Sequence, residues 1–202
     1  YGLITSLDPD HLDIYGDEES FIKAFEEFST QIKNLPLIAK NVVWNYGEHE
    51  RYGIKTSEGE AVKLNHYASN IKATGTGIKC DLSLDNEGEI IDDVTFSMLG
   101  KHNVENMVGA AALAYHAGMS ASVIKSRLTS FSGIYRRFQV LVNTQGKVYI
   151  DDYAHHPTEI KLAINAVREH FPGRHLTLIF QPHLYSRTID QLSGFCRELA
   201  KA

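Results

Sequence analysis

Apolar and polar positions in the first part of the chain change from strand-like to helix-like spacing. Residues 2–6 form a short apolar run, and a dense polar loop is expected at 8–13. Asp17 and the acidic residues after it are typical of a helix start, because the helix dipole favours negative charge in the first turn. Helical spacing follows in the aromatic and aliphatic residues Phe21, Phe25, Phe28 and Ile32. We therefore expect a buried strand, a polar loop and an amphipathic helix that ends before Pro36.

Short apolar or alternating runs then fill residues 41–96, separated by Gly, Asn and Asp. Such runs between turn residues predict β-strands. The expected strands are residues 42–44, 52–54, 61–64, 71–74, 78–82 and 94–98. At least some of them should be antiparallel, since the intervals between them are short.

Two helices are expected next, followed by a change of pattern. Asn103 can cap the first helix, Gly118 stands where a C-terminal glycine belongs, and the second helix starts near Ser120. The remaining pattern is strand, helix, strand, helix, at residues 148–150, 157–171, 176–180 and 188–200. This order is typical of βαβ units with a parallel sheet.

Together the elements predict an α/β protein with a domain boundary near Gly133. Residues 1–133 are expected to form a partial central ATPase-type domain with a mixed sheet and helices. Residues 134–202 are expected to begin a partial Rossmann-like parallel α/β domain. The chain starts at Tyr1 rather than Met, and a helical pattern still runs at Ala202, so we expect an internal piece of a longer protein.

Composition narrows the classes of function. The chain has 202 residues, of which 43% are hydrophobic and 22% charged, with a formal net charge of -5. The mild acidity argues against a broad nucleic-acid surface. The sequence has no apolar run approaching the roughly 20 residues that span a membrane. Cys80 and Cys196 are isolated, which fits free thiols in a reducing cytoplasm and predicts no zinc site. The pattern specifies no oligomeric state.

Polar clusters follow the predicted strands, where open α/β sheets bind ligands. In residues 8–13, the His11 imidazole beside carboxylates can ligate a divalent cation, although a capped turn would explain the same residues. In residues 151–159, Asp152 and its neighbouring acid repel each other unless a ribose, a metal or an arginine binds them. His155 and His156 in the same segment precede a helix N-terminus that favours anions. Helix capping with an exposed histidine pair is the structural alternative.

Three more segments are candidates. Residues 180–188 contain His183 and Arg187, and Arg187 is a cation that could bind a carboxylate or a phosphate; a surface loop would explain the same residues. Arg137 belongs to a pair of adjacent arginines that suits binding of phosphates in a cleft; a solvated linker is the alternative. The amides of Asn103 and Asn106 could read a base edge, although an Asn cap would explain Asn103 alone.

Five segments in this order resemble the Mur ligase family across essentially the whole chain. They are ITSLDPDHLD at residues 4–13, GKHNVEN at 100–106, FSGIYRRF at 131–138, DDYAHHPTE at 151–159 and FQPHLYSRT at 180–188. The family joins an amino acid to a carboxylate by first phosphorylating the acyl group with ATP. The resemblance is closest to the branch that adds L-alanine to UDP-N-acetylmuramate.

The resemblance implies ATP and Mg²⁺ as cofactors, with UDP-N-acetylmuramate and L-alanine as substrates, in the cytoplasm. The implied roles are Mg²⁺ binding by His11, adenine contacts by Asn103 and Asn106, phosphate contact by Arg137, ribose contact by Asp152, and substrate contacts by His155, His156, His183 and Arg187. Catalytic roles would fall to His11, Arg137, His155 and His156. Nucleic acid and membrane are not expected partners.

The chain also departs from the family pattern. No GxxxxGK[ST] phosphate loop occurs, and Leu184 stands where many relatives carry Arg. The resemblance implies that the phosphate loop, an acidic Mg²⁺ ligand and a UDP-binding domain precede Tyr1. Two alternatives stay open: the branch that recycles murein tripeptide, which shares the segment at 151–159, and a non-catalytic nucleotide-binding module.

We predict that the purified 202-residue chain shows no L-alanine-dependent ATP hydrolysis, because phosphoryl transfer needs a phosphate cradle that this sequence lacks. A coupled assay of ADP release, with and without L-alanine, measures this. Turnover that survives removal of contaminating ligase would contradict the prediction.

Overall fold

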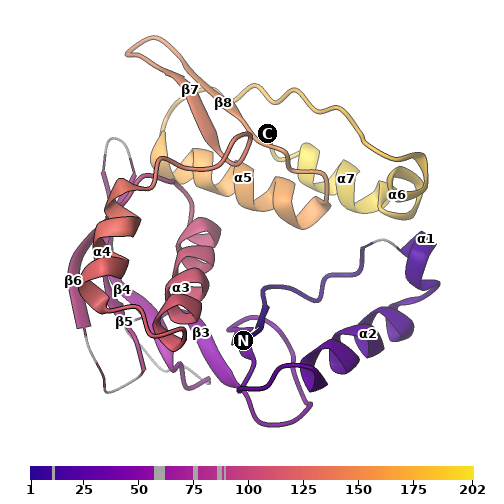
Figure 1. Ribbon diagram of the computed structural model, residues 1–202. Helices are drawn as coiled ribbons and strands as arrows, with labels where there is room; N and C mark the ends of the chain where they lie inside the picture. Colours follow the sequence, from indigo (N-terminus) through magenta and orange to yellow (C-terminus); the bar gives the residue numbers. More distant parts are fainter. Residues whose placement is uncertain (11, 57–61, 75–76, 86–87, 89) are drawn as a thin grey trace. The chain divides into compact units, whose positions relative to one another are not determined.

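A computed structural model of the chain describes residues 1–10, 12–56, 62–74, 77–85, 88 and 90–202. The chain divides into two compact units. The first unit contains Tyr1–Ser97 and Lys101–Phe131, and the second contains Met98–Gly100 and Ser132–Ala202. Figure 1 labels the helices and strands β3 to β8.

The elements of each unit follow in chain order. The first unit contains β1 (Leu3–Ile4), α1 (Leu12–Tyr15), α2 (Glu18–Thr30), β2 (Leu37–Ala39), β3 (Glu50–Ile54), β4 (His66–Ala73), β5 (Ile78–Ser83), β6 (Ile90–Phe96), α3 (Lys101–His116) and α4 (Ala121–Ser130). The second unit contains β7 (Gln139–Asn143), β8 (Val148–Asp151), α5 (Pro157–His170), α6 (Tyr185–Asp190) and α7 (Leu192–Leu199).

A six-stranded mixed sheet forms the centre of the first unit, with the strands in the order β1-β2-β3-β4-β5-β6. Strands β1 to β4 run parallel to one another. Strand β5 runs antiparallel to both of its neighbours, β4 and β6. Helix α3 packs against β2, β3 and β4, while α4 packs against β6 (Figure 1). The α/β class and the antiparallel pairing expected from the sequence are confirmed.

The core of this sheet lies beneath α3. Ile4, Ile38 and Tyr52 come from three adjacent parallel strands and are almost fully buried. Gly109 of α3 faces them, and a Cβ built there would lie 2.9 Å from Cε2 of Tyr52. The absence of a side chain at residue 109 therefore lets the helix approach the sheet closely.

Helix α2 confirms the expected start signal. Asp17 is its N-cap, and the Asp17 carboxylate accepts a 2.8 Å hydrogen bond from the backbone N–H of Ser20. This bond also lowers the pKa of Asp17. Among the apolar residues of the helix, Phe21 is buried and packs against Phe25.

The second unit is built on an antiparallel hairpin, β7–β8, with three helices. Two small apolar clusters hold it together. The first comprises Leu99, Phe138 and Ala166, and the second Ile160, Ile164 and Phe195. Helix α5 contributes to both clusters, as expected from its apolar spacing, and it packs against α7.

Several elements differ from the expectations. Residues 176–180 form no strand, and Ile179 is 88% exposed. The second unit therefore has the antiparallel β7–β8 hairpin in place of the expected parallel sheet. Residues 42–44 form no strand, and Val43 is exposed. Residues 62–64 carry no strand, and residue 61 lies outside the described residues. Strand β2, which follows Pro36 directly, was not expected.

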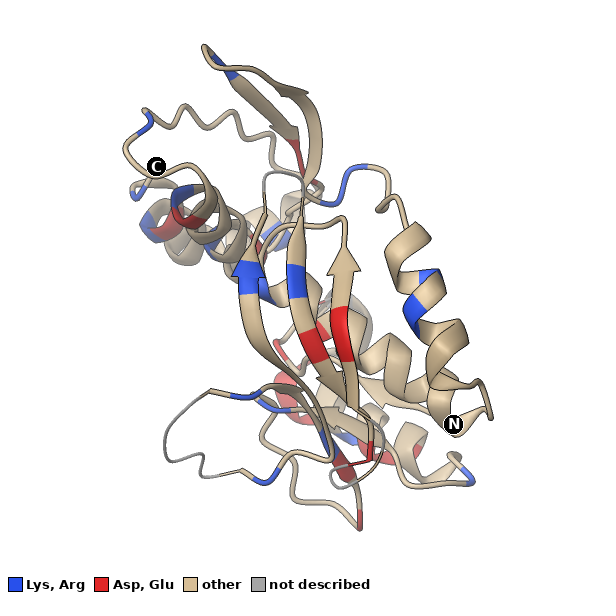
Figure 2. Cartoon of the chain, turned by 90° about the vertical axis from the view of Figure 1, so that its left-hand side faces the viewer, with Lys and Arg blue, Asp and Glu red and all other residues tan. Residues whose placement is uncertain are grey.

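The antiparallel strands of the first unit carry charges of both signs, with the basic positions toward one end of the strands and the acidic positions toward the other (Figure 2). Lys79 pairs with Asp93 at 2.8 Å, and the Asp81 carboxylate accepts hydrogen bonds from Asn70 and from the backbone of Asp93. These exposed pairs each contribute under about 1 kcal/mol. Within the described part of the chain, no helix is long and apolar enough to cross a membrane.

We predict that Ile38→Ala lowers the free energy of unfolding of the first unit by about 2–5 kcal/mol, because Ile38 is fully buried and truncation leaves a cavity. Ile90→Ala is the matched control, since Ile90 lies in the same sheet and is 60% exposed. Its cost should stay below about 1 kcal/mol. Urea unfolding followed by fluorescence of Trp44, the single tryptophan, measures both. Equal losses would contradict this account of the core.

Candidate functional site

The polar segment after β1 contains the expected metal ligand. Ser6 Oγ accepts a 2.9 Å hydrogen bond from the backbone N–H of Asp8, and a single helical turn, α1, begins at Leu12 where a loop was expected. His11 lies outside the described residues. Its proposed role as a Mg²⁺ ligand therefore stays a prediction.

Helix α3 carries both asparagines of the expected base-reading segment. It begins at Lys101, so Asn103 lies inside the helix and is not its cap. The Asn103 side chain is buried, whereas Asn106, one turn later, is exposed. The two amides therefore lie in different environments on one helix of the first unit.

Most of the remaining candidates come together in the second unit around Glu159, in the first turn of α5. Glu159 Oε1 lies 3.3 Å from Nη1 of Arg137, and Oε2 accepts a 2.8 Å hydrogen bond from the backbone N–H of His155. Nδ1 of His155 lies 2.8 Å from the carbonyl oxygen of Tyr153. One carboxylate thus links the arginine to the histidine segment. The sequence reasoning included Glu159 in the candidate segment at 151–159 but gave it no role of its own, although its place three residues after a helix cap is a known signal.

Asp152, which directly follows β8, is hydrogen-bonded to the segment that contains Arg137. Its Oδ2 accepts a hydrogen bond from the backbone N–H of Phe138 at 2.8 Å, and its Oδ1 accepts one from Ala154 at 2.7 Å. Burial raises the pKa of Asp152, and these two N–H groups together with the Arg137 charge offset part of that effect. The carboxylate is therefore held in place by the chain itself, with one lone pair left on each oxygen.

The backbone around Arg137 is strained. Arg136 has φ 56° and Phe138 has φ 48°, both in the left-handed region that non-glycine residues rarely adopt. Three contacts hold this conformation: Phe138 is buried, its N–H bonds Asp152, and the Arg136 carbonyl accepts the N–H of Tyr153 at 2.7 Å. Arg136 also stacks on the Tyr153 ring, 4.8 Å from its centroid. Strain held in this way clusters at functional sites.

His156 is the N-cap of α5, and its Nδ1 accepts the backbone N–H of Thr158 at 3.3 Å. That bond places the ring proton on Nε2, by assignment from the hydrogen-bond pattern. Nε2 is buried and has no hydrogen-bond partner among the described residues. A buried orphan donor beside a helix N-terminus fits an anionic oxygen of a ligand, and so does the guanidinium of Arg137. The donor set therefore suits phosphate or carboxylate groups.

The segment before α6 places its two candidates differently. His183 is exposed, whereas Arg187 is 7% exposed within α6. Leu184, which precedes α6, has φ 67° and is 45% exposed. The segment thus presents Leu184 at the surface and buries Arg187.

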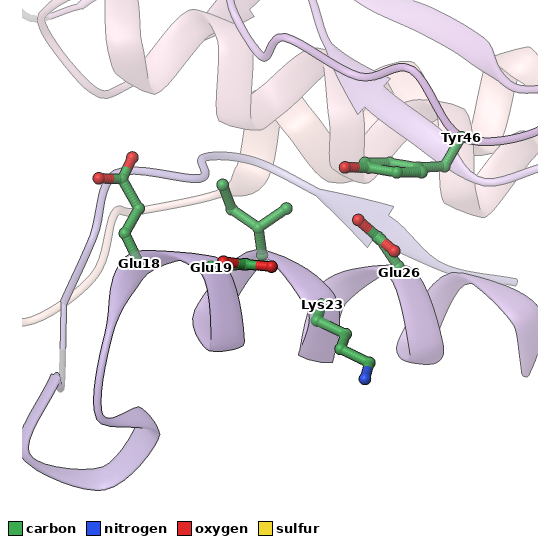
Figure 3. Close-up of a pocket in the computed structure, with 6 residues that line it drawn as sticks. Glu18, Glu19, Lys23, Glu26 and Tyr46 are labelled. Carbon is green, nitrogen blue, oxygen red and sulfur yellow. The ribbon is translucent and has the colours of Figure 1, made fainter.

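Two features were not found from the sequence. A groove along α2 is lined by Glu18, Glu19, Lys23, Glu26 and Tyr46, with the Tyr46 ring over the helix (Figure 3). A hydrogen bond to Glu26 raises the pKa of Tyr46. Three glutamates against one lysine make this groove unsuited to phosphates.

The second feature is a cluster of Glu50, His66 and His116 in the first unit. His66 Nε2 lies 2.7 Å from Oε2 of Glu50, and His116 Nε2 lies 2.9 Å from the same oxygen. Burial lowers the pKa of His66, against the effect of Glu50. Burial alone would raise the pKa of Glu50, but the hydrogen bonds and charges of the two imidazoles outweigh it and hold that pKa below its usual value.

Comparison with known proteins identifies the class. The family described as Mur ligase middle domain matches residues 1–114, and that described as Mur ligase, glutamate ligase domain matches residues 136–202. The chain belongs to the Mur ligase family.

Among curated relatives, the UDP-N-acetylmuramate–L-alanine ligase of Cytophaga hutchinsonii is 36% identical over 98% of this chain and 42% of its own length. The enzyme of the same name from Parabacteroides distasonis is 39% identical over 98% of this chain and 43% of its own length. The chain thus spans about two fifths of the length of these relatives.

Solved structures agree on the fold. The UDP-N-acetylmuramate–alanine ligase of Thermotoga maritima superposes with a TM-score of 0.72 and 25% identity, over 99% of this chain and 43% of that one. The folylpolyglutamate synthetase of Lactobacillus casei shares only the fold, with a TM-score of 0.60 and 18% identity, over 87% of this chain and 44% of that one.

We predict that Asp152→Ala destabilises the second unit by about 2 kcal/mol, because it leaves the partly buried N–H groups of Phe138 and Ala154 without an acceptor. Asp151→Ala is the control, since its contact with Arg136 is 3.5 Å long and exposed, and should cost under about 1 kcal/mol. Amide hydrogen exchange at Phe138 and Ala154 reports the change. Unaltered exchange in Asp152→Ala would show that the two bonds do not hold the segment.

Proposed function

We propose that the protein to which this chain belongs joins L-alanine to UDP-N-acetylmuramate at the expense of ATP. The observation that carries the proposal is the 36–39% identity, over 98% of the chain, to relatives that bear this activity in their names. The cluster of anion-binding side chains around Glu159 supports it, because the substrates are carboxylates and phosphates.

The proposed chemistry has two steps. ATP, when bound, supplies a γ-phosphoryl group to an oxygen of the muramoyl carboxylate, and ADP leaves. The amine of L-alanine then attacks the activated carbonyl carbon, inorganic phosphate leaves, and the nitrogen loses a proton. Such chemistry depends on positioning and on stabilising charge around oxygens more than on a covalent nucleophile.

The residues of the second unit are assigned by their chemistry. Arg137 would bind a phosphate, because its side chain is 44% exposed. Its contact with Glu159 is long, at 3.3 Å, so the guanidinium can exchange that carboxylate for a phosphate. His156 Nε2 and His155 would bind anionic oxygens of the substrate. Asp152 would accept a ribose hydroxyl with its remaining lone pairs, while its two backbone bonds keep it in position. His183 and Arg187 would serve the substrate end of the same site.

The first unit would supply the remaining groups. Asn103 and Asn106 would contact adenine from the first turns of α3, and His11 would bind Mg²⁺. Neutral amides suit a base edge, because each offers one acceptor and two donors without a charge. We place the reaction in the cytoplasm, in keeping with the isolated cysteines.

We predict that, in the full-length enzyme, Arg137→Ala lowers kcat/KM for ATP by about 100-fold, as loss of one transition-state charge contact does elsewhere. Arg136→Ala should change it less than about threefold, because that guanidinium is engaged with Tyr153 and Asp151. ADP release measured with L-alanine, and separately with murein tripeptide, tests both the residue and the substrate. Faster turnover with the tripeptide would replace L-alanine in the proposal, and equal effects of the two substitutions would remove Arg137 from it.

A further inference from the structure

The cluster of Glu50, His66 and His116 has the arrangement of metal ligands. The three ligand atoms are two imidazole Nε2 atoms and one carboxylate oxygen. The imidazole nitrogens lie 2.7 and 2.9 Å from Oε2 of Glu50 and 3.2 Å from each other. The imidazole rings stand at 78° to one another.

Three separate elements bring these ligands together. Glu50 is the first residue of β3, His66 is the first residue of β4, and His116 is the last residue of α3. The parallel pairing of Tyr52 with His66 fixes the two strands in register. The cluster therefore lies at the amino ends of the parallel strands, whereas the segment proposed for Mg²⁺ follows the carboxyl end of β1.

We infer that Glu50, His66 and His116 bind a divalent transition-metal ion of the zinc type. Two imidazoles and a carboxylate are a known ligand set for Zn²⁺, with metal–ligand distances of about 2.0–2.2 Å. Tetrahedral ligands at those distances lie about 3.3–3.6 Å apart. The two nitrogen–oxygen separations of 2.7 and 2.9 Å would therefore widen by about 0.4–0.9 Å, and the nitrogen–nitrogen separation of 3.2 Å by about 0.1–0.4 Å. His66 is fully buried, while Glu50 and His116 are half-buried, which leaves one side open for a water molecule.

Metal binding must displace one proton. Nδ1 of His66 accepts the backbone N–H of Asp85 at 3.1 Å, so without metal the ring carries its proton on Nε2 and donates it to Glu50. When Nε2 ligates the ion, that proton moves to Nδ1, so the ring stays neutral and the backbone N–H of Asp85 loses its acceptor. The Asp85 carboxylate, whose charge acts on His66, can accept a hydrogen bond from the new Nδ1–H, as carboxylates behind metal-bound imidazoles do. Because the backbone bond of Asp85 is lost, we expect affinity of order micromolar rather than nanomolar.

The ion would act as a cross-link rather than as a catalyst. It would tie the starts of two strands to the end of the helix that covers them, and any ligand that binds only the folded state stabilises it. The effect is independent of the ligase activity proposed above. It is therefore testable by stability and spectroscopy without a turnover assay.

The test is thermal unfolding of the protein with and without Zn²⁺ in a non-chelating buffer. At about 100 times the dissociation constant, the unfolding midpoint should rise by roughly 5–10 °C. Co²⁺ in place of Zn²⁺ should give the intense visible absorption of a four-coordinate site. Glu50→Gln keeps the size of the side chain and removes its charge, and it should reduce the shift at least threefold.

His116→Ala should abolish the shift and the Co²⁺ absorption. His175→Ala is the matched control, because His175 is an exposed histidine outside the cluster, and it should retain both. Circular dichroism of the metal-free variants checks that each is folded. The inference is overturned if Zn²⁺ shifts the midpoint equally in the parent protein and in His116→Ala or Glu50→Gln, or if it shifts none of them.

Discussion

The close approach of α3 to the parallel strands is the constraint on which the first unit depends. Gly109 allows it, because a Cβ there would stand 2.9 Å from Tyr52 and 3.1 Å from Leu3, both held in the sheet. Tyr52 is itself buried and cannot move aside. The close packing of α3 on the strands in turn fixes the positions of the residues at both ends of the helix. Asn103 lies near the start of α3, in the region proposed for adenine, and His116 lies at its end against Glu50.

The sequence predicted the elements that depend on interactions between residues close together along the chain. Helix α2 begins where Asp17 accepts a backbone N–H, and α5 begins at Pro157 after the His156 cap, so short-range hydrogen bonds and apolar spacing suffice for both. Val42 and Trp44 are buried on either side of the exposed Val43, which is the alternation that predicts a strand, yet residues 42–44 lie outside every strand of the described chain. Residues 176–180 have strand-like composition, but a strand also needs a paired neighbour, which the β7–β8 hairpin does not provide.

The candidate site shows the same division. Its histidines and acids could be picked out because they follow one another along the chain. The partner that organises them could not be recognised as readily, since Glu159 joins Arg137 to His155 across 22 residues. Positive φ values at Arg136 and Phe138 follow from tertiary contacts and leave no mark in composition. The Glu50, His66 and His116 cluster spans 66 residues, so only the strand register and the length of α3 reveal it.

Two partly buried carboxylates show how the donors around an acid decide its charge. Asp152 and Glu50 each accept two hydrogen bonds and each lose solvation. Asp152 receives neutral backbone N–H groups, burial prevails, and its pKa is raised. Glu50 receives imidazoles that can themselves carry charge, and their combined effect overcomes burial and lowers its pKa. The charge of a partly buried acid therefore depends on the donors that surround it as much as on its burial.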